Sequence, residues 1–86
     1  MPYTLIYAPG ALKDLTTLSP AVQKRIIAKL EQLCENPFPH IKRLKGVPLY
    51  SLRIGDYCVI LDVQEVRFII CVITAGHRKN VYNRLP

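Results

Sequence analysis

The 86-residue sequence lacks any apolar stretch close to the about 18–20 residues that a membrane-spanning helix needs. It also lacks an N-terminal basic region followed by an apolar core, which is the pattern of a secretion signal. The length suits one small domain with one core. We therefore expect a single cytoplasmic domain over residues 1–86, with no membrane partner.

Cysteine is scarce, and its placement excludes two classes of small protein. The three cysteines, Cys34, Cys58 and Cys71, are odd in number and show no C-x-x-C spacing. A disulfide scaffold would use paired cysteines, and a zinc site would need four clustered ligands. Neither is expected in this chain.

Acidic residues are also few, with six Asp and Glu against twelve Lys and Arg, and the net charge is +6. Residues 1–41 hold four basic and three acidic side chains, whereas residues 42–86 hold eight and three. The C-terminal half is therefore strongly basic, which indicates a polyanionic partner such as nucleic acid. The alternative is a basic surface that serves only solubility.

The N-terminal half predicts one strand and two helices. Residues 3–8 are rich in strand-forming side chains, and residues 9–18 repeat leucine at helical spacing after Pro9. Ser19 and Pro20 form a good helix start, and Asn36-Pro37 ends that helix. Its apolar stripe consists of Val22, Ile26, Leu30 and Leu33.

After a basic connector broken by prolines (residues 36–46), three strands are predicted over residues 48–54, 57–63 and 66–74. A two-residue turn at Gly55-Asp56 fixes the register and places Arg53 opposite Cys58. A second two-residue turn at Gln64-Glu65 would place Asp62 opposite Arg67 and Cys58 opposite Cys71. A longer loop there would shift this pairing.

Alternation along these strands sorts their side chains onto two faces. The apolar face holds Tyr50, Leu52, Ile54, Tyr57, Val59, Leu61, Val63, Val66, Phe68, Ile70 and Val72. The other face carries Arg53 and is expected to stay partly open. The predicted fold is α+β: an N-terminal strand and a helical hairpin on one face of a mainly antiparallel sheet of about four strands, in the order β-α-α-β-β-β.

Three sequence features together resemble a known family. They are the connector Arg43-Leu44-Lys45-Gly46, the hairpin Tyr-x-Leu-Arg-x-Gly-Asp-Tyr over residues 50–57, and the tail Gly-His-Arg-x-x-x-Tyr ending at Tyr82. With the order of elements, they are similar to the RelE/ParE toxin superfamily, RelE branch. The resemblance implies a toxin of a type II toxin–antitoxin system that enters the ribosomal A site and cleaves mRNA. Cleavage would proceed by attack of a ribose 2′-OH on the adjacent phosphate.

The resemblance also implies roles for individual residues. Arg53 would stabilise the charge of the transition state, and Arg78 would contact phosphate. Tyr82 would stack on a base or pass a proton, and His77 would assist proton transfer. The residues implied in binding RNA are Lys42, Arg43, Lys45 and Ser51. Because these cations supply the charge that a metal would otherwise provide, no metal and no organic cofactor are expected.

Two positions depart from the family pattern. Cys58 stands where the family commonly has Arg, and Ser51 stands where some members have Lys. Loss of one preorganised charge donor costs about 10²–10³ in rate, so reduced activity is expected. Cys58 is then a tolerated loss or, alternatively, a reactive thiolate favoured by the neighbouring Arg53.

The resemblance implies several partners and leaves alternatives open. A cognate RelB-like antitoxin, the ribosome with its rRNA, and mRNA would be partners, with a toxin–antitoxin hetero-oligomer. The first alternative is a ParE-like inhibitor of DNA gyrase. The second is a weakly active or inactive relative that acts through antitoxin binding, in which Cys58→Arg would raise toxicity.

Overall fold

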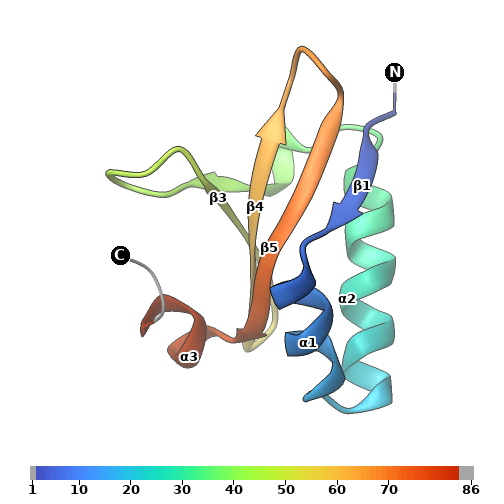
Figure 1. Ribbon diagram of the computed structural model, residues 1–86, viewed down its shortest axis with the longest axis vertical. Coiled ribbons are helices and arrows are strands. Elements are labelled where there is room, and N and C mark those ends of the chain that lie inside the picture. The colour runs from blue at the N-terminus through green and yellow to red at the C-terminus, as the bar shows by residue number, and fades with distance from the viewer. Residues whose placement is uncertain (1, 84–86) are drawn as a thin grey trace.

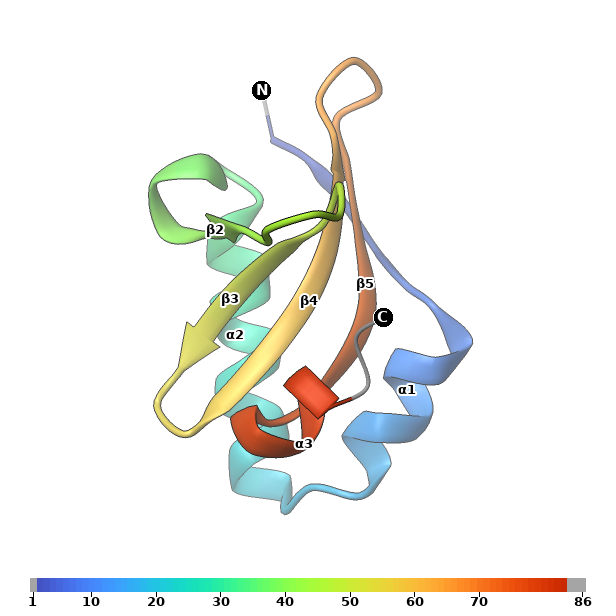
Figure 2. The same cartoon turned by 90° about the vertical axis from the view of Figure 1, so that its left-hand side faces the viewer.

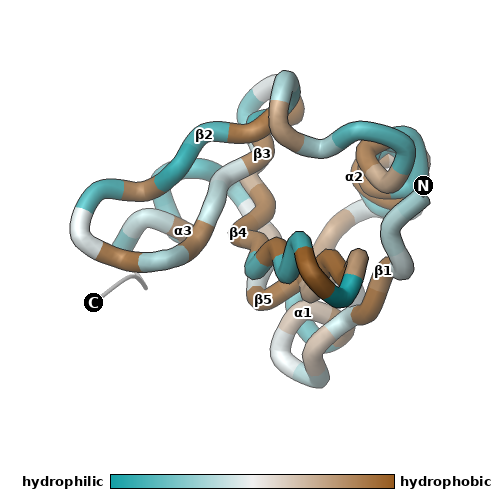
Figure 3. Tube along the Cα trace, turned by 90° about the horizontal axis from the view of Figure 1, so that it is seen from above, coloured by the Kyte–Doolittle hydropathy of each residue, from teal (hydrophilic) through white to brown (hydrophobic). Residues whose placement is uncertain are grey.

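A computed structural model describes residues 2–83, which form a five-stranded mixed sheet with helices on both faces. The strand order is β1-β5-β4-β3-β2. Helices α1 and α2 lie on one side of the sheet, and the short helix α3 lies on the other (Figure 1, Figure 3). The elements are β1 (Thr4–Tyr7), α1 (Pro9–Thr16), α2 (Pro20–Leu33), a 3-10 helix (Phe38–His40), β2 (Lys42–Arg43), β3 (Tyr50–Ile54), β4 (Tyr57–Gln64), β5 (Ile69–His77) and α3 (Arg78–Asn83).

Both N-terminal helices begin where the sequence predicts. Pro9 occupies the first turn of α1, where its missing N–H removes no helical hydrogen bond. Ser19 caps α2, because its Oγ accepts a hydrogen bond from the backbone N–H of Val22 at 3.4 Å. Pro20 then starts the helix.

The expected α+β fold is confirmed, with one strand more than the four expected. The additional strand is β2, in the connector, where Lys42 pairs with Ser51 and Arg43 pairs with Tyr50. At the opposite edge, β1 runs parallel to β5, while the other pairs are antiparallel.

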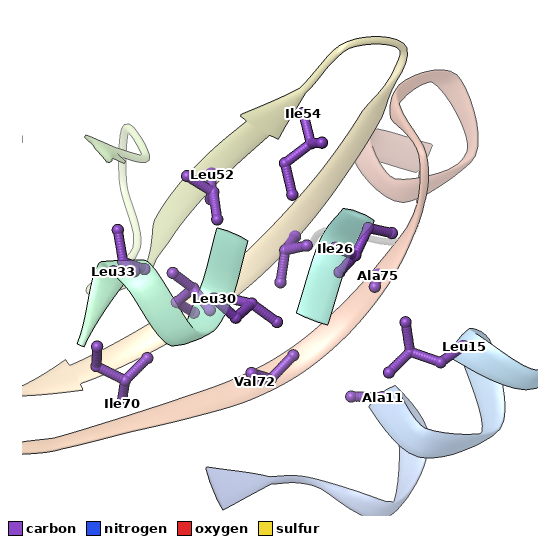
Figure 4. Close-up of a cluster of buried hydrophobic side chains, with 12 residues drawn as sticks. Ala11, Leu15, Ile26, Leu30, Leu33, Leu52, Ile54, Ile70, Val72 and Ala75 are labelled. Carbon is purple, nitrogen blue, oxygen red and sulfur yellow. The ribbon is translucent and has the colours of Figure 1, made fainter. Parts of the chain in front are cut away.

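The main core fills the space between α1, α2 and the sheet (Figure 4). From α2 it takes Ile26 and Leu30, both fully buried, and from α1 it takes Ala11 and Leu15. Its remaining buried members are Leu33, Leu52, Ile54, Val59, Leu61, Ile70, Val72 and Ala75. The apolar stripe expected on α2 is therefore the face that packs on the sheet.

The two-residue turn considered at Gln64-Glu65 does not form, and the longer loop left open as the alternative is present. Residues 65–68 form a four-residue loop that ends at Phe68 with a φ of 53°, and Gln64 pairs with Ile69. The partner of Asp62 is accordingly Cys71, four residues beyond the expected Arg67. Because four is an even number, Ile70 and Val72 keep the predicted buried face. Val66, expected on that face, is 93% exposed at the loop tip, and Phe68 is 39% exposed.

A β-bulge further changes the pairing between the first half of β4 and the second half of β5. The register between β4 and β5 shifts between Ile60 and Leu61, so that Ile60 pairs with Thr74 and Leu61 with Val72. Beyond the bulge, Cys58 pairs with Gly76 instead of the expected Cys71. The bulge thus sets which residues of β5 reach the β3–β4 hairpin.

Candidate functional site

The β3–β4 hairpin has the register that the sequence predicts, with Arg53 opposite Cys58. Its turn residue Gly55 has a φ of 58°, a conformation that favours glycine. Arg53 is exposed, and its Nε–H donates to the carbonyl oxygen of Gly55 at 3.4 Å. The side chain therefore lies back along its own turn with its guanidinium accessible.

The end of β5 meets this turn. His77, the last residue of β5, pairs with Tyr57, and the two rings meet edge to face with centroids 5.8 Å apart. The backbone N–H of Arg78 donates to the carbonyl oxygen of Asp56 at 2.9 Å. Arg53, His77 and Arg78 are therefore gathered at one end of the sheet, where α3 begins (Figure 2).

The sequence predicts that the sheet face opposite α1 and α2 stays partly open. Around Cys58 this face is instead covered. Helix α3, which sequence reasoning missed, covers it there. Val81 of α3 is fully buried with Cys58 and Ile60 in a second, smaller core. The partly buried residues around this core are Leu44, Leu49 and Ile73. Tyr82, the next residue of α3, is 44% exposed.

Cys58 is a buried thiol in contact with the candidate site. Burial raises its pKa, while a side-chain hydrogen bond with Tyr82 and the positive charge of Arg78 lower it; burial has the larger effect. A raised pKa means that the thiol stays protonated at neutral pH. Burial of Cys58 thus disfavours a thiolate at this position. The Cys58 side chain packs against Val81 of α3 in the second core.

Arg78 is half-buried, and its Nε is hidden from solvent without a hydrogen-bond partner in the described part of the chain. An unpaired buried donor costs about 1–3 kcal/mol. Native structures contain few such groups, and functional sites are among the places where they occur. The backbone N–H of Arg78, bonded to the Asp56 carbonyl oxygen, positions this residue beside the β3–β4 turn.

The four residues implied in RNA binding lie on β2, β3 and the loop between them. Lys42 and Arg43 on β2 and Lys45 in the loop are exposed. Ser51 is only 8% exposed, so little of its surface can contact RNA. The loop closes through a hydrogen bond from the N–H of Leu44 to the carbonyl oxygen of Leu49 at 2.9 Å. It projects on the same side of the sheet as α3 (Figure 2).

Asp14 of α1 is a supporting residue that sequence reasoning missed. One oxygen of its carboxylate accepts hydrogen bonds from Thr74 Oγ1 at 2.5 Å and from the backbone N–H of Ala75 at 3.3 Å. Both donors lie on β5 directly beyond the bulge. The link spans about 60 residues of sequence, so no local pattern could reveal it.

We expect Asp14→Ala to lower the free energy of unfolding by about 2–3 kcal/mol, because two hydrogen bonds to a charged group are lost. Urea unfolding followed by circular dichroism measures the change. Lys13→Ala, at the exposed neighbouring position, is the control and should stay within about 0.5 kcal/mol of the wild type. Equal stability of the two variants would contradict the anchoring role of Asp14.

Within residues 2–83, no three His, Cys, Asp or Glu side chains are grouped so that they could hold a metal ion. None of the helices in that range has the length and apolar character to cross a membrane.

Nearly the whole chain is similar to one known protein family. Residues 5–82 match the model of the ParE toxin of the type II toxin–antitoxin system parDE. A RelE-like toxin protein of Escherichia coli is 30% identical over 88 residues, which cover 96% of this chain and 93% of that protein. The mRNA interferase toxin RelE of Escherichia coli K12 is 28% identical over 82 residues, covering 92% and 86%.

Solved structures give the same relationship. A double mutant of the Escherichia coli toxin RelE, in the free state, has a TM-score of 0.79 and 27% identity, covering 96% of this chain and 93% of that chain. The archaeal RelE–RelB complex from Pyrococcus horikoshii has a TM-score of 0.78 and 27% identity, covering 91% and 97%. Both solved structures cover more than nine-tenths of this chain.

Proposed function

The chain belongs to the RelE/ParE toxin superfamily, as a toxin of a type II toxin–antitoxin system, and we propose that it is a ribosome-dependent endonuclease that cleaves mRNA in the A site. The similarity to the mRNA interferase toxin RelE supports this activity over the alternatives. The observation that carries the proposal is the convergence of Arg53, His77 and Arg78 on the β3–β4 turn.

The proposed reaction is an attack of a ribose 2′-OH on the adjacent phosphate with departure of the 5′-oxygen. The pentavalent transition state carries more negative charge than the ground state, so fixed cations lower the barrier. Arg53 is the accessible cation at the turn, and its planar guanidinium can donate two hydrogen bonds to one phosphate. Arg78 adds a second cation from the start of α3.

The two remaining side chains of the site have different proposed roles, proton transfer for His77 and base stacking for Tyr82. His77 is exposed at the end of β5, where its imidazole can exchange a proton with the ribose hydroxyl or with the leaving oxygen. Tyr82 is partly exposed on α3, and its ring offers a surface for stacking on a base. A side-chain hydrogen bond with Tyr82 also lowers the pKa of the Cys58 thiol, so the Tyr82 hydroxyl lies near this thiol.

The proposed partners follow from the same relationship. Lys42, Arg43 and Lys45 are exposed cations suited to an RNA backbone, which we propose belongs to the ribosome or its mRNA. The relatives include RelE proteins in complex with RelB. A RelB-like antitoxin that inhibits the toxin in a hetero-oligomer is therefore the proposed protein partner.

Primer extension on translating ribosomes, with and without the purified protein, tests the proposed activity. New mRNA ends inside codons positioned in the A site are expected, and none when the ribosomes are omitted. If no cleavage appears with antitoxin-free protein, the endonuclease assignment is wrong.

A second candidate is favoured by one specific observation, since the matching family model is that of the ParE toxin. A ParE-like toxin would inhibit DNA gyrase, which a supercoiling assay detects directly. Inhibition of supercoiling without mRNA cleavage would establish this alternative.

A further inference from the structure

The last part of β5 extends beyond the strand that covers its outer edge. Strand β1 pairs with β5 as far as Val72, where the N–H of Ala8 donates to the Val72 carbonyl oxygen at 2.9 Å. The chain then turns into α1, so within residues 2–83 no strand borders β5 on this side from residue 73 onwards. Helix α1 packs against this stretch of β5, which ends at His77 (Figure 1).

The carboxylate of Asp14 takes the place of a neighbouring strand at this edge. It accepts the hydrogen bond of the Ala75 N–H, which a strand carbonyl would otherwise accept, and that of the Thr74 hydroxyl. Asp14 lies in the last turn of α1, where the partial negative charge of the helix end disfavours a carboxylate. The partners on β5, rather than the helix itself, therefore explain an acidic side chain at this position.

Helix α1 is itself firmly attached to the main core. Ala11 is fully buried and Leu15 is 6% exposed, and both belong to that core. The first turn of α1 also approaches the sheet closely, since a Cβ on Gly10 would lie 3.8 Å from the carbonyl oxygen of Ile73. Ile73 is the residue that the β-bulge leaves without a partner on β4. Asp14 thus holds β5 directly beyond the point where its register with β4 shifts.

One glycine separates this attachment from the residues of the candidate site. A Cβ on Gly76 would lie 3.3 Å from a side-chain atom of α3, so a larger residue would crowd this helix. Glycine restricts the backbone least, and the direction of His77 therefore depends on what holds the chain on either side. On one side Ala75 is bonded to α1, and on the other the N–H of Arg78 donates to the carbonyl oxygen of Asp56.

We propose that Asp14 is a positioning residue of the cleavage reaction, which orients His77 and Arg78 toward the scissile phosphate by holding Thr74 and Ala75. The effect on cleavage rests on the proposed function, whereas the effect on the direction of His77 rests on the geometry of β5 alone. Because α1 and α3 lie on opposite sides of the sheet, Asp14 acts on the site through β5 (Figure 3). Misplacement of a reacting group by about 1 Å costs about 10²-fold in rate.

The test uses two matched pairs of variants. Asp14→Asn keeps an oxygen that can accept both hydrogen bonds, and Asp14→Ala removes it. Thr74→Ser keeps the hydroxyl, and Thr74→Val removes it at nearly the same volume. Val22→Ala takes part of a half-buried side chain of α2 away from the main core and controls for a general loss of stability. All variants are compared at a temperature at which circular dichroism shows each to be folded.

Two measurements separate positioning from stability. The first is single-turnover cleavage of mRNA on ribosomes at saturating protein, together with the affinity for ribosomes. The second is the NMR spectrum of the His77 ring, whose edge-to-face contact with Tyr57, at 5.8 Å between centroids, produces a ring-current shift. The chain has two histidines, so His40→Gln identifies the His77 signals.

We expect Asp14→Ala to cleave about 10–10²-fold more slowly than the wild type with unchanged affinity for ribosomes. Its His77 signals should lose the ring-current shift from Tyr57. Thr74→Val should show a smaller effect of the same kind, and Asp14→Asn and Thr74→Ser should resemble the wild type.

Unchanged His77 signals in Asp14→Ala, or a loss of cleavage as large in Val22→Ala, would overturn the proposal. If the wild type itself does not cleave mRNA, the proposed function fails. The His77 signals then decide by themselves whether Asp14 positions the end of β5.

Discussion

Replacement of Arg53 by alanine is expected to lower the rate of mRNA cleavage on ribosomes by about 10²–10³-fold, the usual cost of removing one preorganised donor from a developing oxyanion. Arg53 is exposed, and the one hydrogen bond of its side chain within residues 2–83 is to the carbonyl oxygen of Gly55 in its own turn. The free energy of unfolding should therefore change by no more than about 0.5 kcal/mol. Single-turnover primer extension at saturating protein separates this chemical effect from ribosome binding.

Two variants sharpen this measurement. Arg53→Lys keeps the charge but loses the planar pair of donors, so its rate should lie between those of the wild type and Arg53→Ala. Arg67→Ala removes an arginine of the same charge from the β4–β5 loop and should cleave normally. Should Arg53→Ala cleave as fast as Arg67→Ala, the assignment of Arg53 to the transition state would be wrong.

The β3–β4 hairpin could be predicted from the sequence because a two-residue turn leaves a single register. Gly55 supplies the positive φ, and the alternating strands fix which side chains are buried, so Arg53 and Cys58 were correctly paired. The helix starts at Pro9 and Ser19 follow from equally local chemistry. In each case, residues within four positions of one another determine the result.

The β4–β5 pairing could not be predicted in this way. Gln64 and Glu65 offer no turn chemistry, and the actual loop ends on a phenylalanine in the left-handed region, which bulky residues rarely adopt. Phe68 is held there by the edge-to-face contact of its ring with Tyr3 and by the hydrogen bond from the Thr4 N–H to its carbonyl oxygen. Both partners come from the other end of the sequence: Thr4 is the first residue of β1, and Tyr3 directly precedes it.

Helix α3 escaped prediction because its stability is tertiary. It has six residues, and Val81 is the one residue of this helix that is buried. An isolated helix of this length is unstable in water. Its anchors are Cys58 and Ile60 on β4 and the carbonyl oxygen of Asp56. The sequence therefore predicts that Arg78 and Tyr82 lie near the hairpin. It does not show that both residues belong to a helix that covers Cys58.

This packing leads to a second large effect. We expect Cys58→Arg to lower the free energy of unfolding by about 3 kcal/mol or more, although the resemblance noted in the sequence implies that the family commonly has Arg at this position. Cys58 is fully buried beneath Val81, so a larger side chain must displace α3. The new guanidinium would also lie beside the positive charge of Arg78, which already acts on Cys58. A buried charge without a partner is among the most destabilising changes known.

Cleavage by Cys58→Arg should consequently fall rather than rise, because Arg78 and Tyr82 move with α3. Hydrogen exchange of the backbone amides of residues 78–83 reports displacement of the helix, and urea unfolding reports the loss of stability. Cys58→Ser, which keeps the volume and a hydroxyl for Tyr82, is the matched control and should retain slow exchange. Slow exchange together with faster cleavage in Cys58→Arg would instead show that an arginine fits beneath α3. In that case, Cys58 would stand in place of a catalytic arginine, and restoring the arginine would restore its charge.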